Sequence, residues 1–277
     1  MSPIKEPHFY CSDFNAGILV NRAEYDALFA KASDIHAAVG EASTSYLYSQ
    51  VAIPNIEREL SEPRYIAMVR NPVEMAHAQY EQVYHDGLEH IKDFAQAWEL
   101  SQKRAQGRQV TRWCREPKFL DYKSICKLGQ QLARLLAIVP RERVLVLILD
   151  EVKENPRGEY LKVLQFLGVE DDGRREFPVK NPAKENRSFL LQKAVRPLVN
   201  LFLLGKRKIR IPGSSYFNIF LHELYYQLYR RLNTRPRPRA PLPPRLRAKM
   251  AEYFRDDVIL LSQLLQQDLT GWLRTSR

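Results

Sequence analysis

Arg70 has the sequence position that most clearly allows chemistry. It follows a short apolar run, Tyr65 to Val69, and precedes Asn71 and Pro72. The run is typical of a buried parallel strand. Asn followed by Pro is a typical helix start, because Asn caps free amides and Pro has no N–H to leave unpaired. Arg70 is therefore expected at the carboxyl end of a strand, where α/β sheets bind ligands and where a guanidinium suits a phosphate. An ion pair with a nearby carboxylate is the alternative.

Composition places the chain among soluble globular proteins. Of its 277 residues, 45% are hydrophobic and 27% are charged. No apolar run approaches the roughly 20 residues that a membrane-spanning helix needs, and the first residues lack the apolar core of a signal peptide. We therefore expect a cytoplasmic protein without a transmembrane segment.

The cysteines and histidines indicate neither disulfides nor a metal. The three cysteines are far apart and lack Cys-x-x-Cys spacing, and the six histidines form no cluster. The net charge of +11 indicates tolerance for a polyanion: nucleic acid, an anionic membrane surface or a ligand with several phosphates. Nucleic acid is disfavoured, since the basic residues are dispersed and no stacking motif accompanies them.

Apolar runs and amphipathic stretches alternate along the chain as they do in α/β domains. Besides the strand before Arg70, strands are expected at 37–41 and at 143–149, the latter at the centre of the sheet. Helices are expected at 22–33, 72–85, 91–106, 121–138, 156–167, 189–204, 215–232 and 245–268. The predicted domains are an α/β core at 1–190 and a helical extension at 191–277.

Four stretches together resemble one family. They are Lys-Glu-Pro-His-Phe-Tyr at 5–10, Gly-Glu-Ala-Ser-Thr-Ser-Tyr-Leu at 40–47, Val-Arg-Asn-Pro-Val-Glu at 69–74, and the strand at 143–149 with the helix ending in Phe-Leu-Gly-Val at 166–169. Their order and spacing resemble the sulfotransferase domain that uses 3′-phosphoadenylyl sulfate (PAPS), of the heparan sulfate sulfotransferase type and its bacterial relatives. The resemblance implies a P-loop NTPase-like fold and transfer of a sulfuryl group to a hydroxyl or amine without a metal.

The resemblance also implies residue roles. Glu6 would be the general base on the acceptor, and His8 would help to orient it. Arg70 would hold the 3′-phosphate, and Lys184 and Arg187 would lie in a basic loop over the nucleotide. Without the resemblance, Glu6 would be a solvated loop carboxylate, His8 a packed core histidine, and the two basic residues a solvated turn.

A hydroxyl-rich turn lies within the second of these stretches. Ser43, Thr44 and Ser45 could line the acceptor cleft, although such turns are common. Two positions depart from the family. Ala78 stands where a serine usually follows the arginine by eight residues, and Ala42 stands where heparan-modifying enzymes often have lysine.

The phosphate loop of the family, Pro-Lys-x-Gly-Thr-Thr after a first strand, is not found in the sequence. None of the 11 glycines has that setting. Either Met1 is an internal methionine of a longer product, or the chain is a short form; as written it is expected to be weakly active or inactive. The alternatives are a non-catalytic anion-binding module, or weak association of the aromatic and cationic stretch 201–229 with an anionic membrane surface.

Overall fold

The computed structural model describes residues 2, 5–14, 21–111, 114, 116–178, 184–187, 233–236 and 239–274. The chain divides into two units. Met1–Tyr84, Leu88–Pro178 and Leu242–Arg277 form the first, and His85–Gly87 with Val179–Pro241 form the second. The domain boundary expected near residue 190 stays a prediction.

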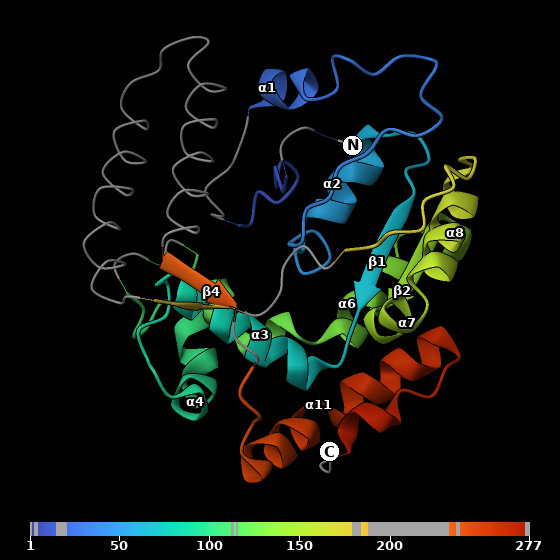
Figure 1. The fold of residues 1–277 in the computed structure, drawn as a ribbon. Coiled ribbons are helices and arrows are strands. Elements are labelled where there is room, and N and C mark those ends of the chain that lie inside the picture. Colours follow the sequence, from blue (N-terminus) through green and yellow to red (C-terminus); the bar gives the residue numbers. More distant parts are fainter. Residues whose placement is uncertain are drawn as a thin grey trace. The chain divides into compact units, whose positions relative to one another are not determined.

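The first unit is built on a parallel pair of strands. β1 (Tyr65–Val69) lies beside β2 (Val144–Ile148), with Tyr65 opposite Val144 and Val69 opposite Ile148 (Figure 1). Both strands were predicted. The prediction that β2 lies at the centre of the sheet is wrong for the described residues, because the parallel sheet there has only these two strands. The segment 37–41, which was predicted to be a strand, forms no third strand. Its residues 37–39 are exposed and pair with no other strand in the described part of the chain.

The two faces of β1 differ in burial. Ala67 and Val69 are buried, whereas Ile66 and Met68, which point the other way, are 43% and 51% exposed. The apolar run predicts cover on both faces, but the described part of the chain covers only one. The second strand is contacted by α7 and α8, which follow it directly in the chain (Figure 1).

Helices supply most of the regular secondary structure in the described residues. Their bounds are α1 (Arg22–Ala27), α2 (Ala52–Glu59), α3 (Pro72–His85), α4 (Phe94–Ala105), α5 (Tyr122–Ile125), α6 (Leu128–Leu136), α7 (Leu149–Glu154), α8 (Pro156–Leu167) and α11 (Pro244–Leu265). Short 3₁₀ turns lie at Pro117–Leu120, Arg141–Arg143 and Thr270–Leu273. Among the described helices, none is both long enough and apolar enough to cross a membrane.

The helix starts predicted at Asn71 and Asn155 and the helix end predicted at Gly168 are confirmed. The side chain of Asn71 accepts the N–H groups of Val73 at 2.9 Å and Glu74 at 3.4 Å, so α3 begins where expected. Asn155 caps α8 in the same way, and Gly168 ends it with a left-handed φ of +69°. Arg70 therefore lies between the end of β1 and the cap of α3, as the local sequence predicts.

The single helix predicted at 121–138 is two helices. α5 ends at Ile125, and the amide Nε2 of Gln131 donates to the carbonyls of Ser124 at 3.3 Å and Ile125 at 3.0 Å. α6 starts again after Lys127, because the Asp257 carboxylate accepts the first free amides of the new helix. Groups distant in sequence thus stabilise a break that the apolar period does not reveal.

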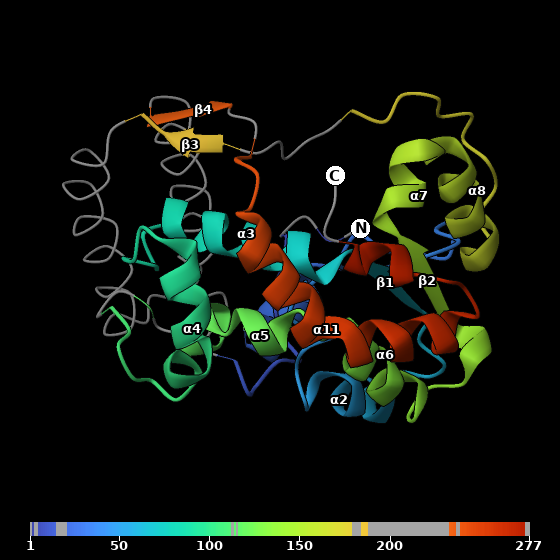
Figure 2. The same cartoon turned by 90° about the horizontal axis from the view of Figure 1, so that it is seen from below.

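The core of this unit lies between these helices. α11 packs along α6, as both views show (Figures 1 and 2). The largest fully buried side chains are Trp98, Arg104, Tyr122, Phe254, Leu120, Leu132, Met250 and Leu261. The core therefore joins the middle of the chain to its last long helix.

The second unit contains an antiparallel pair in its described part. β3 (Lys184–Asn186) pairs with β4 (Thr234–Pro236). The N–H of Arg187 donates to the carbonyl of Asn233 at 2.7 Å and extends the pairing by one residue. Three predictions lie outside the described residues: the helices expected at 189–204 and 215–232, and the membrane-associating stretch 201–229.

Candidate active site

Glu6 and Thr44 bring the first two sequence motifs together. The hydroxyl of Thr44 donates to Oε2 of Glu6 at 2.9 Å, and Nε2 of His8 lies 3.5 Å from the same oxygen. The N–H of Glu6 donates to the carbonyl of Ala42 at 3.2 Å, so the two segments lie side by side. Both bonding partners therefore hold one oxygen of the carboxylate, and Oε1 has only the exposed Lys5 ammonium at 3.4 Å.

The surroundings of Glu6 keep its carboxylate ionised. The imidazole of His8 is the largest cause that lowers the pKa of Glu6, to about 2; burial opposes the shift, and Thr44 and Lys5 add to it. The Glu6 side chain is 29% exposed. The site thus presents an oriented carboxylate that stays charged at neutral pH and can be reached from solvent.

The backbone of this loop is strained at the same two residues. Glu6 has a φ of +54° and His8 a φ of +52°, the left-handed region that costs a non-glycine residue about 1 kcal/mol or more. His8 is only 6% exposed, and its Nδ1 has no hydrogen-bond partner in the described part of the chain. Such strain persists only where neighbouring contacts hold the loop.

Glu41 supplies those contacts. Its carboxylate accepts hydrogen bonds from Ser43 Oγ at 2.8 Å and from the Tyr46 hydroxyl. Ser43 Oγ in turn accepts the N–H of His8 at 3.0 Å, and the Tyr46 hydroxyl accepts the N–H of Tyr10 at 3.4 Å. Burial and Glu41 raise the pKa of Tyr46, which keeps its hydroxyl a donor.

No role was predicted for Glu41, although it stands in the second motif. Its position directly before the hydroxyl-rich turn was the available signal, since hydroxyl groups that fix a loop need acceptors. Ser45 differs from its two neighbours. It is buried, and its carbonyl accepts the N–H of Ser49 at 2.9 Å, as in a helical turn.

Arg70 lies on a separate element of the same unit. It is half-buried at the carboxyl end of β1 and close enough to the fully buried Cys126 to influence it: burial raises the pKa of that thiol, and Arg70 opposes the rise. Ala78 lies on α3, two helical turns further on. The structure thus places Arg70 where the sequence predicts, with no hydroxyl at position 78.

Lys184 and Arg187 belong to the second unit. Lys184 is the first residue of β3, and Arg187 is exposed directly after that strand. The structure therefore unites Glu6, His8, Ser43 and Thr44 in one cluster, whereas the three predicted cofactor-binding residues lie on other elements.

No protein-family model and no curated protein matches the sequence. Among solved structures, the chain is similar to a sulfotransferase from Alicyclobacillus acidocaldarius, with a TM-score of 0.67 and 21% sequence identity. The similarity covers 99% of this chain and 87% of that one.

The chain has a sulfotransferase fold. This confirms the predicted fold class, an α/β arrangement with a small parallel sheet flanked by helices. The sulfotransferase fold extends through the last helices as well, because nearly the whole chain takes part in the match.

Proposed function

We propose that this chain is a sulfotransferase that transfers a sulfuryl group from PAPS to a hydroxyl or amine, with Glu6 as the general base and with the low turnover expected where the phosphate loop is not found. The cluster around Glu6 carries the proposal. An ionised, partly exposed carboxylate is held by Thr44 and His8 on a strained loop, and this loop belongs to a chain with a sulfotransferase fold. Oriented carboxylates of this kind abstract protons from hydroxyl groups.

The proton transfer follows from the two oxygens of Glu6. Oε2 is occupied by Thr44 and His8, so Oε1 is the oxygen that receives the acceptor proton. A carboxylate with a pKa near 2 is a weak base for a free alcohol. It takes the proton as the acceptor oxygen bonds to sulfur, because that bond makes the hydroxyl strongly acidic.

Arg70 is proposed to hold the 3′-phosphate. The half-buried guanidinium at the end of a parallel strand fits a phosphate in charge and in hydrogen-bond donors. When bound, PAPS supplies the sulfuryl group and keeps the electron pair of the broken S–O bond as 3′-phosphoadenosine 5′-phosphate leaves. No magnesium is required in this scheme, and Lys184 and Arg187 stay predictions for the nucleotide.

Calorimetric titration with 3′-phosphoadenosine 5′-phosphate tests the nucleotide half of the proposal. Saturable binding that is lost in Arg70→Ala and kept in Arg58→Ala, a helix-surface control, is expected. Absence of binding by the folded wild-type chain would contradict it.

The catalytic half needs a turnover assay with PAPS and a panel of sugar, phenol and amine acceptors. Glu6→Gln is expected to lower kcat at least a hundredfold, whereas Glu170→Gln, a change at an exposed carboxylate, is expected to leave it unchanged. Equal kcat in wild type and Glu6→Gln would show that Glu6 is not the general base.

A second candidate function rests on the distribution of charge. Residues 85–87 and 179–241 contain fourteen Lys and Arg against three Asp and Glu, a net charge of +11, which equals the net charge of the whole chain. The remaining residues are therefore neutral overall, so the net positive charge, unlike the individual basic residues, is not dispersed along the chain. This asymmetry favours an anion-binding module, and anionic lipid is its proposed partner. Salt-sensitive sedimentation with vesicles containing phosphatidylserine tests it; equal sedimentation with neutral vesicles would contradict it.

A further inference from the structure

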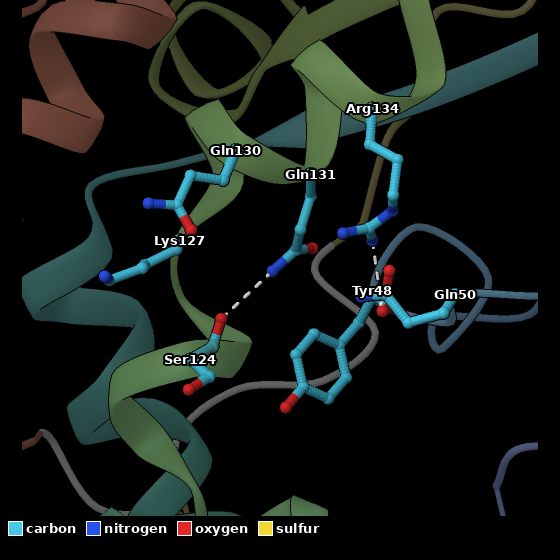
Figure 3. A pocket seen from close by; sticks show the side chains of 7 residues that line it. All are labelled: Tyr48, Gln50, Ser124, Lys127, Gln130, Gln131 and Arg134. Atoms are coloured by element: carbon cyan, nitrogen blue, oxygen red, sulfur yellow. Dashed lines mark hydrogen bonds between the residues drawn. The ribbon is translucent and has the colours of Figure 1, made fainter. Parts of the chain in front are cut away.

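A polar pocket of about 220 Å³ lies in the first unit, apart from the Glu6 cluster. It opens between the start of α6, the end of α5 and the chain before α2 (Figure 3). Its lining residues are Tyr48, Gln50, Ser124, Lys127, Gln130, Gln131 and Arg134. Two of them are cationic, the others carry amides or hydroxyls, and no carboxylate is among the described residues that line it.

Arg134 is fixed at one wall. Its Nη2 donates to the carbonyls of Leu47 at 2.7 Å, Tyr48 at 3.1 Å and Ser49 at 3.4 Å. The other terminal nitrogen is turned toward Gln131 (Figure 3). Burial lowers the pKa of Arg134. A partly desolvated guanidinium with donors to spare gains from an anionic partner.

Gln131 forms the back of the pocket and is only 4% exposed. Its Nε2 donates to two backbone carbonyls of α5, which fixes the plane of the amide. With its donors engaged, Oε1 remains as an acceptor beside Arg134 (Figure 3). The wall therefore pairs an anion-binding group with an acceptor for a ligand hydroxyl.

The carboxylates around the pocket are already engaged. Asp13, whose charge opposes the fall in the pKa of Arg134, accepts the N–H of Gln50 at 3.0 Å. Asp257 accepts the N–H groups of Gly129 and Gln130, both at 2.9 Å. Asp121 accepts the Ser101 hydroxyl at 3.0 Å and the N–H of Ser124 at 3.2 Å. The amides at the start of α6 are thus occupied, and only side chains remain to bind a ligand here.

Lys127 adds the second positive charge. Its Nζ lies 5.2 Å from the centre of the Tyr253 ring, a cation–π contact, and its side chain points away from Arg134 (Figure 3). We propose that this pocket binds the oxyanion group of a small ligand, with Arg134 as the contacting cation, Lys127 adding electrostatic attraction from a greater distance, and Gln50, Gln130 and Ser124 supplying hydrogen bonds. Sulfate, phosphate and carboxylate share this chemistry, and the ligand is either the free anion or a sugar acid whose hydroxyls reach Gln131.

NMR titration of the full chain at constant ionic strength tests the proposal, with backbone amide signals of Gln130 and Gln131 as the readout. The probes are inorganic sulfate, glucuronate and neutral glucose. Saturable shifts with sulfate or glucuronate are expected, and tighter binding of glucuronate would assign the site to a sugar acid. No shift with either anion, or equal binding of glucose, would overturn the proposal.

Gln130→Glu is the decisive variant, because the exposed side chain can change without disturbing the core. The introduced charge is expected to weaken anion binding about tenfold, and Lys127→Gln is expected to act in the same direction. Gln165→Glu, the same change on the exposed surface of α8, is the control and is expected to bind like wild type. Unchanged affinity in Gln130→Glu and Lys127→Gln, with thermal unfolding like wild type, would refute the site.

Discussion

The hydroxyl of Thr44 donates a hydrogen bond to Oε2 of Glu6 at 2.9 Å, although the two residues are 38 positions apart in the sequence. One hydrogen bond thus links the hydroxyl-rich turn to the proposed base. It acts on the same oxygen as His8, and the other oxygen stays open to an acceptor. The two motifs therefore work as one site.

Removal of the Thr44 hydroxyl is expected to raise the pKa of Glu6. A hydrogen bond to a charged group contributes about 1.5 to 3 kcal/mol, so Thr44→Val is expected to raise the pKa of Glu6 by about 1 to 2 units. Thr44→Ser keeps the donor and is expected to titrate like wild type. Carbon-13 NMR titration of the carboxyl group measures both, and coincident curves for the Val variant and wild type would contradict the prediction.

The lowered pKa of Glu6 makes the stability of the fold depend on pH. Because the folded-state pKa of about 2 lies below the ordinary glutamate value of 4.5, ionised Glu6 stabilises the fold above pH 4.5, and this contribution is lost as the pH falls toward 2. Glu6→Gln is expected to lower the free energy of unfolding by about 2 kcal/mol at pH 7 after solvent screening. Urea unfolding from pH 7 to pH 3 measures the difference. A gap between the two proteins that stays constant with pH would show that ionisation is not its cause.

Glu41 is expected to hold the strained loop in place. Glu41→Gln weakens the hydrogen bonds from Ser43 and Tyr46, so the amides of His8 and Tyr10 are expected to exchange with solvent at least tenfold faster. Hydrogen exchange followed by mass spectrometry measures this. Glu62→Gln, at an exposed residue before β1, is the matched control. Equal protection from exchange in the two variants would show that Glu41 does not hold the loop.

A buried ion pair anchors the segment after α3. Arg104 donates through both terminal nitrogens to Glu89, which also accepts the Tyr122 hydroxyl at 2.8 Å. Burial alone would raise the pKa of Glu89, but these hydrogen bonds lower it overall. Arg104→Met is expected to destabilise the fold by about 3 to 5 kcal/mol, since it leaves a buried charge unpaired.

A second substitution, at the partner residue Glu89, separates the penalty for the unpaired charge from the loss of packing. Combining Arg104→Met with Glu89→Gln removes the buried charge and is expected to recover part of the lost stability. Denaturant unfolding of the single and double variants measures the effect. A double variant less stable than Arg104→Met would contradict the charge explanation.

Gly129 lies at a close contact between α6 and α11. A Cβ built at Gly129 lies 2.3 Å from the backbone oxygen of Asp257, so Gly129→Ala forces the two helices apart. Overpacking of this kind costs about 1 to 3 kcal/mol. Gly40→Ala, where nothing lies within 4 Å, is expected to be nearly neutral. Equal thermal midpoints for the two variants would show that the helix contact yields freely.

Local patterns were predicted well because their physical causes are local. Asn71 caps α3 through amides two and three residues away, and Gly168 ends α8 by its own left-handed conformation. The apolar runs before Arg70 and after Arg143 likewise form strands of five residues each. In such elements, the groups that decide the structure lie within one or two turns of chain.

The sequence by itself therefore determined that a strand, Arg70 and a helix follow one another. It also determined the fold class and the candidate residues Glu6, His8 and Thr44. Tertiary structure decided how these groups meet: Thr44 bonds Glu6, Glu41 holds the loop, and Asp257 restarts a helix more than a hundred residues away. It also decided that one face of β1 is exposed. The physical reason is that a hydrogen bond or a buried face needs a partner, and a partner distant in sequence leaves no mark on local periodicity.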